Sequence, residues 1–534
     1  MKSGTPQAGR FRRNFFAVRV KRGPRRRRGK YAPVHRDGYS GGNDGKTKGG
    51  KRMMETVDVA IIGGGITGCA IAYELSKTTA KVALLEKSND VAAGATRANS
   101  GIIHAGYDPL PGTKMARYNV EGNALTRRLA ADLHVPYRGN GSLVLALGEG
   151  ELPAVRQLYE RGMRNGVPGL RLLTGEETRQ KEPRISPEVA GALWAPTAGI
   201  ISPWEMAIAL AETAVVNGCG FYPCWEVTGL RRTEEGLYQL TSARGELLAR
   251  FVVNAAGTHG DRVAALAGPP PFRILPNRGQ YYLLDKSQGD MVDATIFQCP
   301  SAAGKGVLVA PTVHGNLIVG PDAETVEDPD DVAVTSAGLA RVAQAARRSL
   351  PDLSLRETIR HFAGVRAISD QEDFILEQAA GHPRLIHVSG IKSPGLTSAP
   401  ALARDCAALL REAGLEAEEK GDFRLCPRPK TFRAADAEER AAMIRSNPLY
   451  GRVICRCETI TEAEIVAAVR SPIPARSVDG VKRRAGAGMG RCQGGFCGPR
   501  VAAILAREWG IPLPQVLMDR PGTELLAGET KQDG

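Results

Sequence analysis

The chain has 534 residues, 43% of them hydrophobic, and a formal net charge of +14. It is too long for one compact core, so about two or three domains are expected. The charge lies in residues 1–52, which hold 17 of the 71 Lys and Arg residues and two of the 57 Asp and Glu residues. The remainder is near neutral, which argues against nucleic-acid binding by a basic folded face.

The segment 1–52 contains many glycines, few aliphatic residues and the run Arg25 to Arg28, so we expect it to be disordered. Three interpretations stay open: a basic arm for nucleic acid or acidic lipid, a transit peptide, and a stretch translated upstream of the true start. Met53 and Met54, just before the first expected strand, favour the third. We expect no specific nucleic-acid partner.

The first folded stretch carries a glycine motif. Val57 to Ile62 predicts a strand, Gly63-x-Gly65-x-x-Gly68 a tight turn, and Ile66 to Thr78 a helix. The first glycine permits the turn, the second lets backbone N–H groups approach a pyrophosphate, and the third lets helix and strand pack closely. Glu86 ends a second predicted strand, where an acidic side chain binds ribose hydroxyls. The pattern predicts a dinucleotide site without separating FAD from NAD.

The middle of the chain alternates between helical and β-rich patterns. Apolar spacing predicts a helix over 113–134, and Ser202 followed by Pro203 and Glu205 predicts a capped helix toward Asn217. A further helix is expected from Ser398. Strands are predicted over 142–147, 251–257 and 385–390, and a mostly antiparallel sheet, a candidate substrate lid, between residues 276 and 321. The apolar window 57–75 contains charges and glycines, so no transmembrane segment is expected.

Four cysteines near the C-terminus form two close pairs in glycine-rich loops, Cys455 with Cys457 and Cys492 with Cys497. Four thiolates in this arrangement predict a 2Fe-2S cluster, with structural zinc and uncoordinated thiols as alternatives. A capping box at Thr461 and Glu464 and a helix beginning at Pro499 are expected beside them. The other six cysteines are expected to be buried thiols in a reducing cytoplasm.

These patterns predict an α/β protein in several parts. They are a basic tail (1–52), a Rossmann-like dinucleotide-binding body (53–425) with β-rich substrate-domain insertions at about 135–200 and 265–365, a linker (426–451), a small helical cysteine domain (452–520) and a tail (521–534).

Several ordered motifs resemble a known family: Gly94 to Gly106, Pro111 to Arg117, Asn254 to Gly257, and Phe362 to Arg366. They look like the D-amino-acid-oxidase-type FAD-dependent oxidoreductases, with closest likeness to glycerol-3-phosphate dehydrogenases of the anaerobic large-subunit type and to L-2-hydroxyglutarate oxidases. The cysteine pattern is similar to the BFD-like 2Fe-2S domain.

The resemblance implies an FAD site and the residues that hold it. The motif glycines would hold the pyrophosphate and Glu86 the ribose, while Val227 would offer backbone contacts to adenine. The residues lying along the cofactor or approaching its ring system would be Asn99, Ser100, Gly257, Gly390, Gly395, Leu396 and Thr397.

Three side chains are candidates for catalysis. Arg366 suits a bidentate grip on a carboxylate or phosphate, with a structural ion pair as the alternative. His104, in a glycine-flanked loop, is a candidate base, with His361 as its rival. Lys392 would stabilise reduced flavin or bind substrate. Oxidation by flavin needs such a base and such a cation.

The sequence therefore predicts a cytoplasmic FAD-dependent dehydrogenase that oxidises a small anionic 2-hydroxy compound, most simply glycerol 3-phosphate, and passes electrons through a 2Fe-2S cluster. The alternatives are L-2-hydroxyglutarate, an amino acid or an amine as substrate, or a non-catalytic electron-transfer subunit. We expect an electron-accepting protein or companion subunits as partners, and peripheral membrane association only through such a partner.

Overall fold

The computed structural model describes residues 55–300 and 306–528. The chain divides into two units, Met1–Met53 and Met54–Gly534, and all described residues belong to the second. The predictions for the basic segment lie outside the described residues, as do those for residues 529–534.

The first sheet has a parallel centre made of β1 (Glu55–Ile62), β2 (Val82–Leu85) and β12 (Gly245–Asn254), with β1 in the middle. Val59 to Ile62 are buried on both faces, as a central parallel strand requires. β9 extends the parallel pairing beyond β2, and β20 does so beside β12. The sheet has eight strands, and the others are β9 (Gly220–Tyr222), β10 (Gly229–Arg232), β11 (Tyr238–Ser242), β19 (Ile375–Ala379) and β20 (His382–Ser389).

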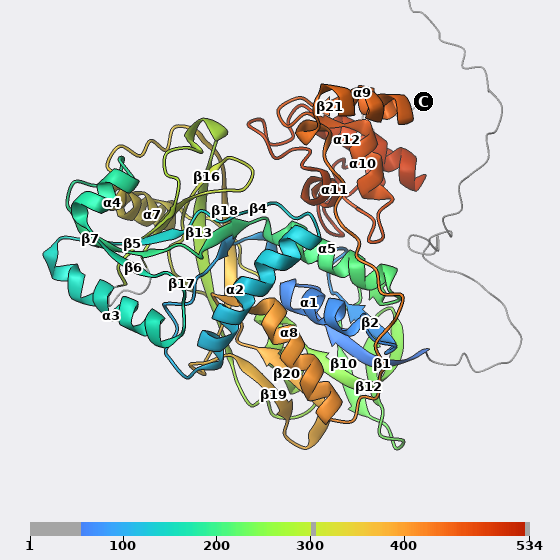
Figure 1. The fold of residues 1–534 in the computed structure, drawn as a ribbon. Coiled ribbons are helices and arrows are strands. Elements are labelled where there is room, and N and C mark those ends of the chain that lie inside the picture. Colours follow the sequence, from blue (N-terminus) through green and yellow to red (C-terminus); the bar gives the residue numbers. More distant parts are fainter. Residues whose placement is uncertain (1–54, 301–305, 529–534) are drawn as a thin grey trace, which may run out of the picture. The chain divides into compact units, whose positions relative to one another are not determined.

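Three helices pack beside this sheet: α1 (Ile66–Leu75), α5 (Pro203–Val216) and α8 (Gly395–Glu412). Val59 and Ile61 of β1 join their core, whereas Ala60 and Ile62 face a second cluster that contains Trp225. Alternate side chains of β1 thus enter two different cores. α1 follows β1 after the short turn 63–65 (Figure 1).

The second sheet has nine strands, mostly in antiparallel pairs. β13 (Ile274–Leu284) and β18 (Thr358–Ser369) pair along nearly their whole lengths. The other strands are β5 (Ser142–Leu147), β6 (Arg171–Thr174), β7 (Val189–Ala195), β14 (Thr295–Gln298), β15 (Leu308–Pro311), β16 (Leu317–Gly320) and β17 (Glu324–Thr325). The antiparallel sheet predicted between residues 276 and 321 is confirmed.

Further elements surround and connect the two sheets. A small sheet joins β3 (Ile102–Ile103), β8 (Gly199–Ile201) and β4 (Tyr137–Arg138). Thr113 caps α2, which confirms the helix predicted there. The helices are α2 (Lys114–Asp132), α3 (Leu152–Arg164), α4 (Gly175–Lys181), α6 (Gly260–Ala265) and α7 (Ser336–Ser349).

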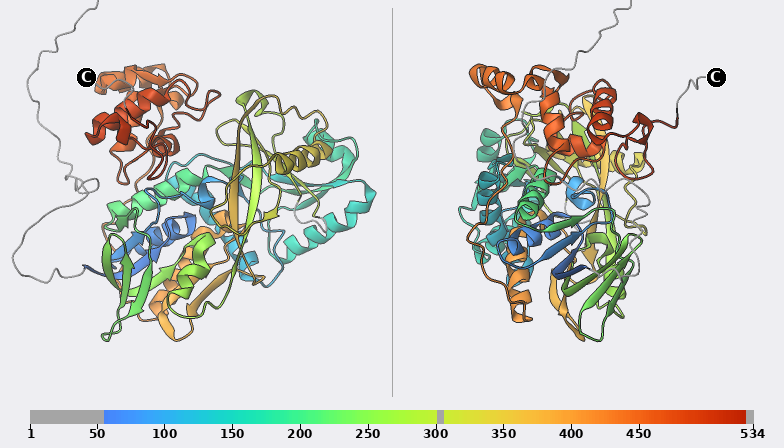
Figure 2. Two further views of the ribbon diagram at one scale, coloured as in Figure 1. Left: turned by 180° about the vertical axis from the view of Figure 1, so that it is seen from behind. Right: turned by 90° about the vertical axis from the view of Figure 1, so that its right-hand side faces the viewer.

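The cysteine module has a core of its own, built around residues such as Ile465, Val481 and Leu505. In both views of Figure 2 its helices form a distinct group. Its elements are β21 (Val453–Cys455), β22 (Ile460–Thr461), α10 (Glu462–Val469), α11 (Val478–Ala485) and α12 (Gly498–Trp509). Thr461 and Glu464 form the predicted capping box, and α12 begins at Gly498 with Pro499 in its first turn, as expected.

Three local predictions were wrong in detail. Ser202 precedes α5 without a side-chain cap hydrogen bond, and the carboxylate of Glu205 pairs with Arg428 and His314. The helix expected from Ser398 begins at Gly395. The stretch expected to be a linker contains α9 (Ala437–Ser446), which has a complete capping box between Asp436 and Glu439.

Candidate cofactor and cysteine sites

The glycine turn after β1 is built so that larger residues cannot replace two of its glycines. Gly63 has a φ of +111°, and a Cβ there would lie 2.4 Å from the carbonyl oxygen of Ala255. A Cβ on Gly68 would lie 1.9 Å from the carbonyl oxygen of Gly63, so α1 packs directly on the turn. Gly65 precedes α1 and supplies no side-chain cap. The helix N-terminus therefore meets the turn in the manner of a pyrophosphate cradle.

Glu86 lies at the end of β2 against this turn. Its carboxylate accepts hydrogen bonds from the backbone N–H groups of Gly64 and Ser88, both at 2.7 Å. Burial raises the pKa of Glu86, and the two backbone donors oppose that rise. Val227 lies close in the chain, in the connection before β10, where Trp225 donates its N–H to the Glu86 carbonyl. Sequence and structure thus place an acidic group and an open backbone segment beside one glycine turn.

The loop after β2 is held by its own side chains. Asn99 donates to the carbonyl oxygens of Ala95 and Thr96 and accepts from the N–H of Gly101. Thr96, which the sequence did not single out, accepts from the N–H of Ile66 at 2.9 Å and so caps α1. The amide of Asn99 therefore shapes the loop, while the neighbouring Ser100 is partly buried.

Gly257 and the loop 390–397 follow strands of the first sheet. Gly257 is exposed with a φ of +58°, and a Cβ there would meet open space. Gly390 follows β20 with a φ of +66°, and Gly395 and Leu396 begin α8. Thr397 is fully buried in the first turn of the helix.

His104 meets this loop through two contacts. Its backbone N–H donates to Oγ1 of Thr397 at 2.9 Å, and its Nε2 lies 3.2 Å from Oγ of Ser393. The ring of Phe297 lies beside the imidazole, with ring centroids 5.8 Å apart. The structure therefore brings together His104 and the segment predicted to approach the flavin. Sequence reasoning missed Ser393 and Phe297 as its neighbours, since neither carries a local signal.

Arg366 lies within β18. It donates to the side chain of Asn277 on β13 and, at 2.9 Å, to the carbonyl oxygen of Asp322. Two residues earlier on β18, a Cβ on Gly364 would lie 2.0 Å from the carbonyl oxygen of Ala98, so this face of the strand touches the loop that contains Asn99. Arg366 is thus near the predicted cofactor loop, held by sheet partners that the sequence could not identify.

The remaining two candidates are Lys392, which precedes Ser393 in the loop 390–397, and His361, which lies on β18. Lys392 donates to the carbonyl oxygen of Glu372 at 3.2 Å. His361 is exposed on β18 and packs against the ring of Tyr282. It is five positions from Arg366, about 17 Å along an extended strand. His104 is therefore the better placed of the two histidines.

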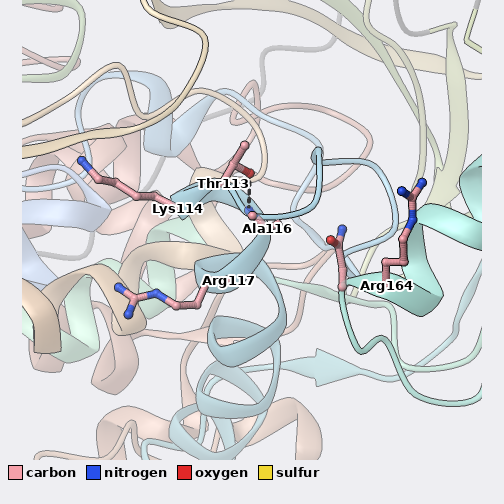
Figure 3. A pocket seen from close by; sticks show the side chains of 7 residues that line it. Thr113, Lys114, Ala116, Arg117 and Arg164 are labelled. Carbon is pink, nitrogen blue, oxygen red and sulfur yellow. Dashed lines mark hydrogen bonds between the residues drawn. The ribbon is translucent and has the colours of Figure 1, made fainter.

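A basic hollow of about 320 Å³ lies at the start of α2 (Figure 3). Lys114, Arg117 and Arg164 line it, and Thr113 caps the helix there through the N–H of Ala116. Arg117 forms an ion pair with Asp405, and Lys114 donates to a carbonyl oxygen. None of the predicted catalytic residues lines this hollow.

In space the four cysteines of the module form two pairs, Cys457 with Cys492 and Cys455 with Cys497. The close pairs in the sequence are different: Cys455 with Cys457, and Cys492 with Cys497. Cys457 and Cys492 are exposed, with their sulfur atoms 3.7 Å apart. Cys455 and Cys497 are buried. A hydrogen bond with Cys497 lowers the pKa of Cys455 to about 6, and the same bond raises the pKa of Cys497.

This arrangement fits two metal ions better than one. Two thiolates bound tetrahedrally to one metal lie roughly 3.8 Å apart, close to the separation of Cys457 and Cys492. Within residues 55–300 and 306–528, no three His, Cys, Asp or Glu side chains gather to hold a single ion. A 2Fe-2S cluster needs one sulfur pair for each iron, whereas a structural zinc ion needs all four sulfurs at one point.

The other cysteines were predicted to be buried. Cys69, Cys219, Cys299 and Cys406 are buried, but Cys224 and Cys426 are only partly so, because both lie in connections outside the regular elements. None of the ten cysteines, all of which lie in the described part of the chain, forms a disulfide.

One side of the cysteine module contacts the second sheet. Arg491 pairs with Asp285 and Glu357, and Gln493 lies 3.4 Å from Arg360 of β18. Buried Glu458, next to Cys457, pairs with Lys286 at 2.7 Å. A single strand, β18, therefore extends from the cysteine loop to Arg366.

No helix in the described part of the chain is long and apolar enough to cross a membrane.

Comparisons with known proteins agree with this geometry. A family model described as FAD dependent oxidoreductase matches residues 58–409, and one described as BFD-like 2Fe-2S binding domain matches residues 453–507. The chain is 46% identical to a glycerol 3-phosphate dehydrogenase of Caloramator mitchellensis, over 89% of this chain and 99% of that protein. It is 29% identical to the human mitochondrial L-2-hydroxyglutarate dehydrogenase, over 68% and 91%. The FAD-bound L-alpha-glycerophosphate oxidase of Mycoplasma pneumoniae matches with a TM-score of 0.68 at 32% identity, over 71% of this chain and all of that chain.

Proposed function

Because the chain belongs to the FAD-dependent oxidoreductase family and carries a BFD-like 2Fe-2S domain, we propose that it oxidises glycerol 3-phosphate and delivers the electrons singly to a protein acceptor. One observation carries the choice of substrate: the likeness to a glycerol 3-phosphate dehydrogenase spans both the flavin region and the cysteine module. The likeness to L-2-hydroxyglutarate dehydrogenases supports the same class, a small anionic 2-hydroxy compound.

The glycine turn, Glu86 and the loop 390–397 would hold FAD. Gly63 and Gly68 leave no space for a side chain where a pyrophosphate would approach the backbone, and Glu86 is directly beside that turn. A flavin held by these residues would supply the acceptor for the hydride of the substrate. Val227, Asn99, Ser100, Gly257 and Thr397 would complete the site through backbone contacts and loop shape.

Arg366 would bind the anionic group of the substrate. Its guanidinium is fixed by Asn277 and by a carbonyl oxygen, which leaves its orientation settled before substrate arrives. Arginine presents two parallel N–H groups that match a phosphate or carboxylate. Lys392 would add positive charge near the flavin end of the loop.

His104 would accept the hydroxyl proton. Ser393 lies within hydrogen-bonding distance of its Nε2. This hydrogen bond influences which nitrogen of the imidazole ring carries a proton. Oxidation of a secondary alcohol to a ketone releases two electrons and two protons, one of them from the hydroxyl group. The imidazole provides a site for that proton.

The cysteine module would then connect the flavin to the partner. Its loop contacts the end of β18, whose other end holds Arg366. A one-electron centre there lets the two electrons of each substrate leave one at a time. We propose that this takes place in the cytoplasm, with an electron-accepting protein or companion subunits as partners.

Anaerobic mixing tests the proposal. Purified protein with bound FAD is mixed with glycerol 3-phosphate, L-2-hydroxyglutarate or proline while flavin absorbance is followed. Rapid bleaching by glycerol 3-phosphate alone is the expected result. Faster bleaching by L-2-hydroxyglutarate would move the assignment to that substrate. Bleaching by dithionite but by none of the three compounds would favour an electron-transfer subunit without catalysis.

A further inference from the structure

The exposed side of the cysteine module carries an arginine-rich surface around one aromatic residue. Phe496 is 51% exposed, directly before Cys497. The guanidinium groups of Arg456 and Arg500 lie 5.2 and 5.5 Å from the centre of its ring. Neither arginine forms an ion pair with any residue of the described chain, so both keep their charge available to a partner.

A groove of about 580 Å³ adjoins this aromatic residue through Arg500. The apolar part of its lining, which we call the floor, consists of Val453, Ile454, Ala503 and Ile504, and Glu462 also lines the groove. Arg452 and Arg507 line its rim with Arg500, and both pair with Glu462. Val453 is 38% exposed, so the floor has room for an apolar side chain from outside.

The surface adjoins the sulfur pair that reaches solvent. Arg456 is next to exposed Cys457 in the chain, and Phe496 lies between Cys492 and Cys497. The opposite side of the loop is occupied, because Arg491 and Gln493 contact the second sheet. The side with Arg456, Phe496 and Arg500 lies next to the exposed Cys457 and Cys492 in the chain and carries an exposed aromatic ring.

The charge of the module indicates the kind of molecule. Residues 452–520 contain eleven Lys and Arg against six Asp and Glu, although the chain after residue 52 is near neutral. Positive charge concentrated around a redox centre attracts an acidic partner and orients it before contact. An apolar groove with a charged rim and a central aromatic anchor is typical of protein interfaces.

We propose that Arg456, Phe496, Arg500 and the adjoining groove form the docking surface for an acidic one-electron carrier protein. The carrier presents carboxylates around its own redox centre, and an apolar side chain of the carrier enters the groove. Two carriers, each reduced by one electron, account for the two electrons of one substrate molecule. This inference rests on the proposed function, since it assumes that electrons leave through the cysteine module.

A pair of acceptors that differ in charge tests the surface. Cytochrome c is basic, and cytochrome c with succinylated lysines is acidic. The holoenzyme, reduced by substrate, should reduce the acidic form faster, and added salt should remove the difference. The double variant R456E/R500E should reduce the acidic form about tenfold more slowly and the basic form faster, because reversed charge repels the first and attracts the second.

A matched control separates local from total charge. Arg404 and Arg411 are exposed on α8, so R404E/R411E changes the net charge by the same amount outside the module. It should leave both rates within about twofold of the original. The proposal would be wrong if both double variants reduced the acidic cytochrome c equally slowly. It would also be wrong if R456E/R500E reduced it as fast as the original protein.

Folding and the proposed function are checked in the same experiment. R456E/R500E should retain its iron, its FAD and the rate at which substrate bleaches the flavin. If substrate fails to bleach the flavin, the proposed function fails, and reduction by dithionite followed by gel filtration still tests docking. If the protein bound anionic vesicles, and R456E/R500E abolished that binding but left the rates of cytochrome c reduction unchanged, the surface would be assigned to a membrane. Formation of dimers through it would assign it to a second copy.

Discussion

Arg484 of α11 and Asp90 of the loop after β2 form a two-pronged ion pair, with Nη1 and Nη2 each 2.7 Å from a different carboxylate oxygen. Arg483 adds a third contact at 2.8 Å, and all three side chains are buried. Asp519 extends the network to Arg97 of the same loop. The cysteine module is thus fastened to the loop that follows Glu86.

Replacing Asp90 with Ala should destabilise the protein by about 3–5 kcal/mol, because two buried arginines would lose their main counter-charge. Urea unfolding followed by circular dichroism measures this cost. Limited proteolysis should also release the module sooner. Glu74→Ala, which removes an ion pair with Lys77 that is partly open to solvent, is the control and should cost under about 1 kcal/mol. An equally small loss in Asp90→Ala would contradict the role of the network.

Replacing Arg366 with Ala should lower kcat/KM for glycerol 3-phosphate about a hundredfold, since a charge-assisted contact to the substrate anion is lost. Visible absorbance should show that FAD remains bound. Arg366→Lys should recover only part of the activity, because lysine lacks the planar pair of donors. Arg347→Ala, an exposed change on α7, serves as the control. Unchanged steady-state kinetics in Arg366→Ala would make this side chain purely structural.

Substituting His104 with Gln should slow flavin bleaching by about a hundredfold or more, as removal of a general base does. Stopped-flow absorbance measures this rate. Ser393→Ala removes one hydrogen bond to the ring and should cost about 1 kcal/mol, close to fivefold in rate. If His361→Gln had the larger effect, the assignment of the base would pass to His361.

Changing Cys457 to Ser should remove iron from the protein while substrate still bleaches the flavin. Reduction of cytochrome c should then fall to the background level, because the route through the module is cut. Iron analysis and paired rate measurements check both parts. Cys224→Ser, a partly buried cysteine of the body, should change neither. Zinc in place of iron in protein purified without air would contradict the cluster.

Glu205 predicts a dependence of stability on pH. Burial alone would raise the pKa of Glu205, but Arg428 and His314 lower it to about 2. Against an unfolded value of about 4.3, this shift corresponds to roughly 3 kcal/mol of stability, present above that pH and lost as the pH falls toward 2. The difference in urea stability between the protein and Glu205→Gln should therefore shrink from pH 7 to pH 3. Glu121→Gln, exposed on α2, should show no such trend.

The sequence predicted those features that depend on neighbouring residues. The glycine turn, the helix α2, the capping box of α10 and the strand pattern of β13 follow from spacing within a few residues, and the structure contains them. The capping box of α9 was equally local and was overlooked within a stretch interpreted as a linker.

The parts that were missed depend on residues far apart in the chain. Glu205 pairs with Arg428, which is distant in sequence. The pairing of Cys457 with Cys492 and the contact of Arg366 with Asn277 arise only when separate strands and loops meet. No local pattern records such partners.

The pairing of β13 with β18 has a consequence for the whole molecule. Arg360 and Arg366 are an even number of positions apart, so both project from one face, and their separation cannot vary without breaking the ladder between Ile274 and Leu284. A slip by one residue would turn both arginines to the opposite face together. The strand therefore fixes the distance between Arg366, the proposed substrate anchor, and Arg360, which contacts Gln493 of the cysteine module.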